Sequence, residues 1–214
     1  MLLQPRPLIA PSPLVRPSRR LAVPALAIGA LFTLAPAVRA QHHAGHGGKI
    51  TVPEGAPYTV ADVEFMQGMI AHHAQAIYMS RMAEAHGASP RLLRLATKID
   101  QSQVAEIRLM QEWLRANGQE VPDTSSWRTM RMAGMLTEAQ LMELDAATGA
   151  AFDRLFLQYM IMHHEGALQM VKDLLASPRG GQEVDVNVFA NDVVSTQTAE
   201  INVMRQMLAQ LPGQ

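Results

Sequence analysis

The sequence predicts an all-α fold, a four-helix bundle built from two repeated helical hairpins. The first observation is a Met-rich stretch that occurs twice, at residues 65–73 and 156–164, and ends each time in a His-His pair. Every position of the second copy lies 91 residues after its counterpart, and Asp62 and Asp153 obey the same shift. The second observation is a further repeat, with a shift of 94, in the segment that follows each copy. Each half therefore contains two helices, and the three extra residues belong to the loop of the second hairpin.

Helix start and stop signals place the elements of the bundle. Thr59 with Asp62 is close to a capping box, in which the side chain of each residue bonds the backbone of the other. Ser89 is a cap residue, and Pro90 at the first helical position begins the second helix. The valines that alternate over 184–188 are the only strand signal, and we interpret them as the start of the last helix. Within a domain at 59–211, helices are expected at about 60–86, 90–117, 138–147, 150–176 and 185–211.

The composition limits the function classes. The chain has 214 residues, with 18 Lys and Arg against 19 Asp and Glu, so it lacks the basic charge that nucleic-acid binding needs. It has no cysteine, which excludes disulfides, thiolate metal sites and a cysteine nucleophile. Its 15 methionines suit an adaptable helical core and carry soft thioethers. Because the sequence has no Ser/His/Asp constellation, phosphate loop or helical zinc-protease pattern, we predict no catalytic residues and no enzyme activity.

Residues 1–40 have the features of a cleaved export signal. A leader with four arginines precedes an apolar run at 21–34, and small residues at 37–40 allow cleavage near Ala40. The apolar run is shorter than the ~20 residues that a membrane-spanning helix needs. We therefore expect a bacterial protein that is periplasmic or secreted, with no stable membrane span after cleavage. An uncleaved N-terminal anchor is the main alternative.

Residues 41–58 are predicted to form a His/Gly-rich tail and linker. Cleavage after Ala40 would leave a free amine with histidine in the third position, His43, and with His42 and His46 nearby. Such a terminus chelates Cu(II) or Ni(II) in the square-planar array of nitrogens that these ions prefer. Cyclisation of Gln41 would block the amine, and the alternative is then a flexible tail that binds metals weakly.

On a helical wheel, both histidines of the first copy border one apolar side. Phe65 marks this side on a wheel of ~100° per residue. Met69, His72 and Met79 lie within about 40° of it. His73 lies about 80° away and follows Met69 by four residues, which places these two side chains together. The second copy repeats the pattern. The opposite side of this helix carries Gln67, Ala71, Ala74, Gln75 and Tyr78.

The second helix of each half carries polar residues within its apolar stripe. Glu106 and Glu200 occupy equivalent positions there, with Gln103 and Gln197 beside them. A buried carboxylate without a partner is costly, so an inward Glu needs a histidine or a metal ion. We therefore expect Glu106 and Glu200 to bond the histidine ring nitrogens that a metal does not use.

The repeated histidines and the methionines around them are the candidate metal ligands. A lone histidine on an apolar face is usually a satisfied core residue, but duplicated pairs with methionines at helical spacing favour a metal site. Imidazole and thioether ligands without thiolate favour Cu(I), which is a soft ion. Residues 119–136 form the connection between the second and third helices. Met130, Met132 and Met135 of this connection are further candidate thioether ligands. The candidates in the two copies are Met66, Met69, His72, His73 and Met79 in the first and Met160, His163, His164 and Met170 in the second.

The doubled motif resembles a known family. The runs Phe65-Met66-x-x-Met69-Ile70-x-His72-His73 and Phe156-Leu157-x-x-Met160-Ile161-x-His163-His164 resemble the family called domain of unknown function 305, as do residues 134–137 and two Gln-x-x-Glu-Ile runs. The resemblance covers about 59–211 and implies a ferritin-like four-helix bundle that is often exported. Some members are periplasmic copper-binding proteins linked to copper resistance. Leu157, in place of a methionine, leaves the second copy with fewer thioethers.

We predict an exported protein that binds Cu(I) for copper sequestration or tolerance. The expected cofactor is a copper ion, and the expected partner is another periplasmic copper protein that supplies or receives it. One alternative is a ferritin-like dinuclear-metal enzyme that uses His and Glu, although the two His-His helices lack the Glu-x-x-His pairs of di-iron sites. A second is a metal-free helical interaction module whose histidines form a polar network. His86 is expected to interact with a helix C-terminus instead of a metal. The sequence leaves open whether the two copies form one site or two.

Overall fold

The computed structural model describes residues 50–212, which contain five α-helices, one 3-10 helix and no strand. The all-α prediction is therefore confirmed for this range. The predicted signal peptide at 1–40 and the tail histidines His42, His43 and His46 lie outside the described residues. Within the described range, no helix is both long enough and apolar enough to cross a membrane.

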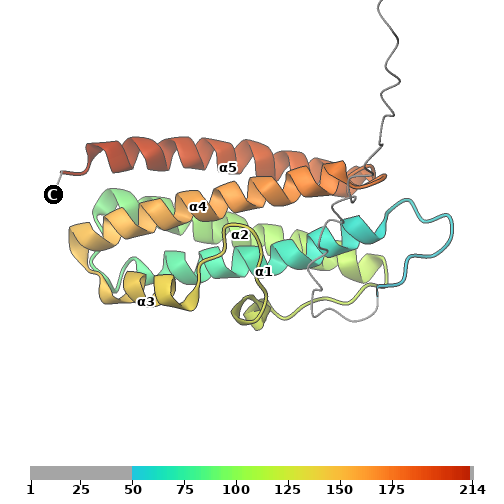
Figure 1. The fold of residues 1–214 in the computed structure, drawn as a ribbon, viewed down its shortest axis with the longest axis horizontal. Helices are drawn as coiled ribbons and strands as arrows, with labels where there is room; N and C mark the ends of the chain where they lie inside the picture. The colour runs from blue at the N-terminus through green and yellow to red at the C-terminus, as the bar shows by residue number, and fades with distance from the viewer. Residues whose placement is uncertain (1–49, 213–214) are drawn as a thin grey trace, which may run out of the picture. The chain divides into compact units, whose positions relative to one another are not determined.

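Four long helices form two antiparallel hairpins, as the repeats predict. The first hairpin pairs α1 (Val60–Met82) with α2 (Pro90–Ala116), and the second pairs α4 (Gly149–Ala176) with α5 (Val184–Gln210). The loops 83–89 and 177–183 are equally long, so the prediction that the second loop holds the three extra residues is wrong, and α4 is the longer helix instead. Figure 1 shows the four long helices running roughly along one direction, and the two hairpins meet where α1 packs against α4. The short helix α3 (Glu138–Ala146) packs against α4.

The cap residues identified in the sequence begin the helices. The Thr59 backbone N–H donates to Asp62 Oδ2 at 2.7 Å, and the Asp62 N–H donates to Thr59 Oγ1 at 3.3 Å, which completes a capping box. α1 ends at Met82, earlier than expected, because residues 83–87 form a turn that ends at Gly87 with a φ of +66°. The connection contains a 3-10 helix, η1 (Thr124–Arg128), where no helix is predicted.

Two buried aspartates join the hairpins reciprocally. Asp62 on α1 accepts a hydrogen bond from the Gly181 N–H, in the loop between α4 and α5, at 2.7 Å. Asp153 on α4 accepts one from the Ser89 N–H, in the loop between α1 and α2, at 3.1 Å. The first helix of each hairpin therefore holds the loop of the other hairpin. This exchange explains why the two aspartates obey the repeat.

A polar layer divides the apolar core into two clusters. The Phe65 cluster contains the starts of α1 and α5 and the ends of α2 and α4. The Phe156 cluster contains the opposite ends. Repeat-related residues such as Met69 and Met160 lie in different clusters. Superposing one half on the other would therefore place each cluster on the other cluster and the polar layer on itself. The polar layer consists of His72, His73, Gln103, Glu106, His163, His164, Gln197 and Glu200.

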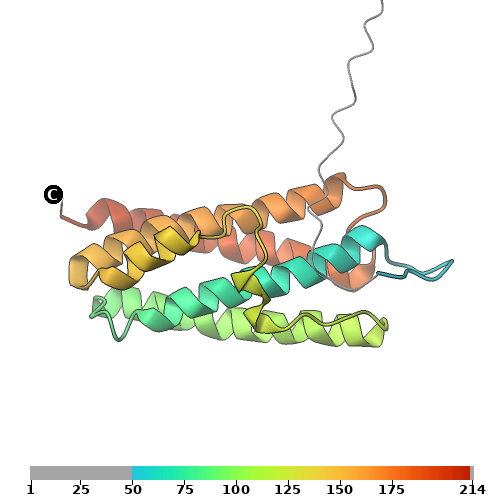
Figure 2. The same cartoon turned by 60° about the horizontal axis from the view of Figure 1, so that its bottom comes forward.

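The connection from α2 to α3 crosses the bundle and buries the side of α1 that faces away from Phe65. Figure 2 shows this connection running back over α1. Gln67 Nε2 donates to the Glu120 carbonyl at 2.9 Å, and Gln75 forms two hydrogen bonds with the Leu136 backbone, at 2.7 and 3.1 Å. As a result, α1 is buried on nearly all sides, although Tyr78 is still 37% exposed.

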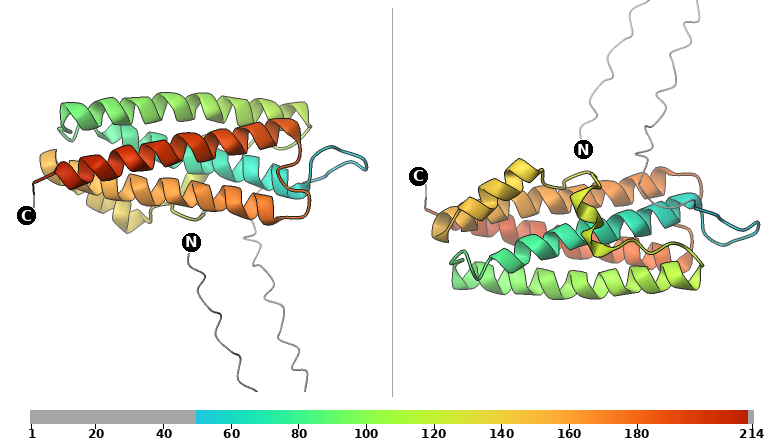
Figure 3. Two further views of the ribbon diagram at one scale, coloured as in Figure 1. Left: turned by 90° about the horizontal axis from the view of Figure 1, so that it is seen from above. Right: turned by 90° about the horizontal axis from the view of Figure 1, so that it is seen from below.

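The connection also touches α4 backbone to backbone. A Cβ atom on Gly166 would lie 2.0 Å from the Ala133 carbonyl oxygen, and one on Gly134 would lie 2.5 Å from the Met162 carbonyl oxygen. Gly134 also has a φ of +76°, which other residues rarely adopt. The two glycines therefore permit a close approach that fixes the connection across α1 and α4, as the right panel of Figure 3 shows.

We expect Asp62→Ala to destabilise the bundle by about 2–3 kcal/mol, because it leaves the buried N–H of Gly181 and the half-buried donors of Thr59 without their acceptor. Urea denaturation of the metal-free protein measures this change. Asp192→Ala removes an exposed carboxylate and is the matched control, with an expected change of about 0.5 kcal/mol or less. Equal stability of the two variants would contradict the proposed role of Asp62.

Candidate metal centre

Four histidines lie in the polar layer, sealed from solvent by the two apolar clusters. His72, His73 and His164 are fully buried, and His163 is 1% exposed. α1 supplies the first pair and α4 the second, because the repeat places a His-His pair at the same point of each hairpin. All four candidate histidines of the bundle are therefore brought to one level of the core.

The two copies meet at the centre of this layer. The rings of His72 and His163 have centroids 3.8 Å apart and are tilted by 39°. Within each pair the centroids are farther apart, 6.4 Å for the first copy and 6.3 Å for the second. The inner histidine of each copy thus contacts the other copy, and the structure contains one shared layer instead of two separate pairs.

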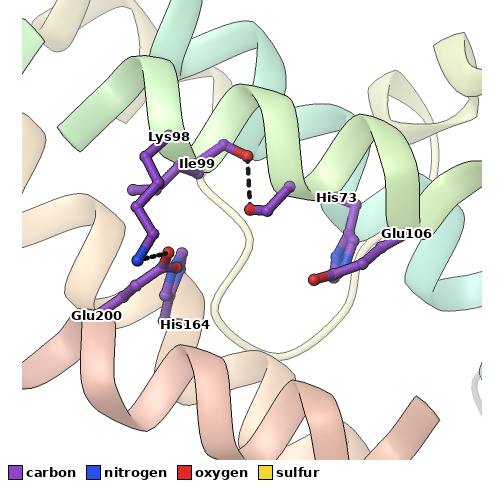
Figure 4. A network of polar contacts seen from close by, with 7 residues as sticks. His73, Lys98, Ile99, Glu106, His164 and Glu200 are labelled. Carbon is purple, nitrogen blue, oxygen red and sulfur yellow. Dashed lines mark hydrogen bonds and ion pairs between the residues drawn. The ribbon is translucent and has the colours of Figure 1, made fainter. Parts of the chain in front are cut away.

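Each outer histidine is held by a glutamate from the partner helix of its own hairpin. His73 Nε2 lies 2.6 Å from Glu106 Oε2, and His164 Nε2 lies 2.9 Å from Glu200 Oε2. Figure 4 shows both pairs, one from each hairpin. The expected pairing of these glutamates with histidines is therefore present. Because a carboxylate only accepts, Nε2 carries the proton and Nδ1 of the neutral ring has a free lone pair.

His72 follows the same rule with a different acceptor. Its Nε2 lies 3.1 Å from the Ala133 carbonyl oxygen of the connection, and a carbonyl also only accepts. Among residues 50–212, neither ring nitrogen of His163 has a well-formed hydrogen bond, although the His72 backbone lies close to the ring. In the neutral form of the other three rings, Nδ1 is therefore the unprotonated nitrogen.

The layer contains many buried polar atoms without partners. Among residues 50–212, these are Nδ1 of all four histidines, His163 Nε2, Gln103 Oε1, both amide atoms of Gln197 and Glu200 Oε1, which has only the distant Lys98 ion pair. Each such atom costs about 1–3 kcal/mol when it is left unpaired. Neutral imidazole nitrogens with free lone pairs, in a dry interior, form a donor set that suits a soft metal ion.

The candidate methionines flank the layer on both sides. Met66 and Met69 lie in the Phe65 cluster, against which Met170 packs. Met79 and Met160 lie in the Phe156 cluster. Within residues 50–212, no three His, Asp or Glu side chains already converge on one metal position. The histidines alone therefore do not form a completed site, and a bound ion would need thioethers or a small rotation of the rings.

Comparison with known proteins agrees with the doubled motif. Residues 62–208 match the family described as Domain of unknown function (DUF305). The chain belongs to this family. The resemblance seen in the sequence is thus confirmed, whereas no curated protein sequence matches significantly.

Solved DUF305 structures share this fold. A fragment from Deinococcus radiodurans is 32% identical, with a TM-score of 0.63 over 73% of this chain and 100% of the fragment. A Streptomyces coelicolor protein, described as secreted, is 30% identical, with a TM-score of 0.61 over 70% of this chain and 93% of its own. CopM in its Cu(I)-bound form is 29% identical, with a TM-score of 0.57 over 71% of this chain and 98% of its own. CopM also has Cu(II)-bound and Ag-bound structures.

The two halves of this DUF305 layer differ in their surroundings. The Glu106 side chain is 20% exposed, whereas the Glu200 side chain is 3% exposed and has Lys98 Nζ at 3.6 Å from its Oε1. The connection forms a hydrogen bond with His72, whereas no equivalent segment within residues 50–212 does so with His163. The helical wheel of the sequence analysis does not predict these differences, because they come from the connection and from a surface lysine. The only sequence signal for the connection was the pair of glutamines, Gln67 and Gln75, on the outer side of α1.

His86 has a different role, as predicted. It lies just beyond the end of α1, where Nδ1 is 2.8 Å from the Met82 carbonyl oxygen and Nε2 is 3.0 Å from the Asp145 carbonyl oxygen. Both ring nitrogens are therefore engaged by backbone. His86 provides an internal reference for histidines that have no free nitrogen.

Burial keeps the central histidines neutral. It lowers the pKa of His72 from 6.5 to about 3, with a further contribution from the neighbouring His73. Burial and the adjacent His72 also lower the pKa of His163 well below its ordinary value. Both rings therefore have a nitrogen lone pair available at neutral pH, whereas a protonated ring would repel a cation.

The stability of the metal-free protein should fall as the pH drops below 6.5. In this range His72 and His163 bind protons in the unfolded chain but stay neutral in the folded chain, because burial lowers their pKa. The expected loss is about 2 kcal/mol for each of these histidines between about pH 7.5 and about pH 5. Urea denaturation at the two pH values measures it. The double variant His72→Gln/His163→Gln should lose most of this pH dependence; an undiminished dependence would contradict the assignment.

Proposed function

We propose that this protein binds Cu(I) in the polar layer and sequesters it outside the cytoplasm. The observation that carries the proposal is the set of four buried Nδ1 atoms that have no hydrogen-bond partner. In three of the rings, a carboxylate or carbonyl at Nε2 directs the Nδ1 lone pair into the interior. Histidines that only stabilised a metal-free core would be expected to bond each other or the neighbouring glutamines.

The donor types support Cu(I) over harder ions. Mg²⁺ and Ca²⁺ prefer oxygen ligands, and structural zinc sites usually include thiolates, which this chain lacks. Neutral imidazole and thioether are ligands that suit Cu(I). The Cu(I)-bound and Ag-bound forms of CopM, which shares the family and the fold, point to the same class of soft ion.

The surroundings of the layer favour storage without turnover. One oxygen of each glutamate, Oε2, already bonds a histidine Nε2 atom, which favours a role in orienting the ligands. The four histidine rings are buried between the two apolar clusters, which shields an ion bound to them from dissolved oxidants and chelators. Glu106 and Glu200 are thus orienting residues in this proposal, and the methionines nearest the layer complete the coordination.

Residues 1–40 and a Streptomyces coelicolor relative that is described as secreted support export. In an oxidising compartment a thiol-free His/Met site keeps its ligands, because it has no cysteine to form disulfides. The mature chain would begin at Gln41 and exchange copper with another periplasmic copper protein. Recovery of the protein only in the cytoplasmic fraction would contradict this location.

Replacing His72, His73, His163 and His164 together by Ala should lower the Cu(I) affinity of the mature chain by about 100-fold or more, since loss of even an outer partner of a metal ligand costs 10–100-fold. Anaerobic competition against a chromogenic Cu(I) chelator measures the affinity, and circular dichroism verifies that the variant is helical.

His86→Ala is the matched control, because both ring nitrogens of His86 are already engaged by carbonyl groups. We expect its Cu(I) affinity to equal that of the wild type. Unchanged affinity in a folded four-histidine variant would overturn the proposed function.

A further inference from the structure

Two methionine side chains meet over the one glycine in the buried stretch of α1. A Cβ atom on Gly68 would lie 3.0 Å from Met132 Sδ and 3.4 Å from Met170 Cε. Met132 belongs to the connection and Met170 to α4, so the two thioethers come from segments far apart in the sequence. The absence of a side chain at Gly68 creates the space in which they lie.

The position of Met132 is fixed by its neighbours. The adjacent residue, Ala133, provides the carbonyl that bonds His72 Nε2 at 3.1 Å. The next residue, Gly134, packs against the α4 backbone at Met162 and Gly166. The segment that carries Met132 is therefore anchored both to a histidine of the layer and to α4, and its thioether is held over α1.

The methionine pair is partly exposed, in contrast to the histidines of the layer. Met132 and Met170 are half-buried, whereas His72 and His163 are buried. Gly68 precedes His72 by four residues, or ~6 Å along the helix axis, and Met170 follows His163 by seven residues, or ~10 Å. Both methionines thus lie one or two helical turns from the layer.

We propose that Met132 and Met170 form a thioether port, which receives Cu(I) at the surface and passes it to His72 and His163. The proposal rests on the proposed function and adds the route by which the ion enters. Transfer is a ligand exchange in which copper stays Cu(I): a thioether–copper bond breaks as an imidazole–copper bond forms, and no proton or electron moves. Two weak, soft ligands suit such a step because they bind the ion without retaining it.

A purely structural role predicts a different result. If the two methionines only fill space, leucine should replace them without functional effect, since the two side chains are similar in volume and polarity. The rate of copper uptake separates the two roles, because a port affects uptake and a filler affects only stability.

The test is the rate of Cu(I) uptake by the metal-free mature chain from a chromogenic Cu(I)–chelator complex, followed by anaerobic stopped flow. We expect Met132→Leu/Met170→Leu to slow uptake by about tenfold, while the equilibrium affinity changes by no more than about threefold. Gly68→Ala should also slow uptake, because its methyl group displaces Met132 Sδ although both thioethers remain. Met142→Leu, at a methionine that is 67% exposed on α3, is the control and should load at the wild-type rate.

Each outcome decides between the claims. Wild-type uptake rates in both the double variant and Gly68→Ala would overturn the port and leave the proposed function standing. A loss of affinity with an unchanged uptake rate would place the two thioethers in the final site, which also overturns the port. A wild-type chain that takes up no Cu(I) would overturn both proposals. Melting temperatures of all variants separate these effects from misfolding.

Discussion

The hydrogen bonds from His73 to Glu106 and from His164 to Glu200 determine what the core of this bundle can do. Each glutamate accepts a hydrogen bond from the Nε2–H group, so in the neutral ring the Nδ1 lone pair is left free among buried side chains. The Ala133 carbonyl constrains His72 in the same way. The result is a group of neutral nitrogen donors without partners, which is costly for a metal-free core and favourable for binding a soft cation. Because apolar clusters lie on either side, unpaired polar atoms in the layer cost free energy, and the layer favours a soft cation over a hard one.

Duplication explains where this layer lies. Superposing one half of the bundle on the other places the Phe65 cluster on the Phe156 cluster and the polar layer on itself. The histidines of both copies therefore meet in the polar layer. The reciprocal bonds of Asp62 and Asp153 hold the halves in this relation. The connection breaks the equivalence: it contacts His72 and carries Met132 to Gly68, with no counterpart on the other side among the described residues. A site built from two equal halves thus acquires one distinct route of access.

Much of this arrangement could be predicted from the sequence, because it depends on local periodicity. The repeats gave the hairpins, the caps gave most helix ends, and the apolar stripe placed Glu106 and Glu200 toward the histidines. Three features could not be predicted. The contact between the His72 and His163 rings depends on how two distant helices pack, and the burial of Gln67 and Gln75 depends on the path of a connection without periodicity. The meeting of Met132 and Met170 over Gly68 depends on a close backbone approach at Gly134 and Gly166, which spacing along the chain does not reveal.

The central claim is that the Nδ1 atoms of the four buried histidines are the nitrogen donors to Cu(I). Long-range ¹H–¹⁵N NMR of the histidine rings, recorded on the metal-free and the Cu(I)-loaded mature chain, tests it atom by atom. The account predicts that copper shifts the Nδ1 resonances of His72, His73, His163 and His164. It also predicts that the Nε2 atoms of His73 and His164 stay protonated and bonded to Glu106 and Glu200, and that His86 does not change. Copper-induced shifts at Nε2 of the outer histidines, or no shift in any of the four rings, would contradict it.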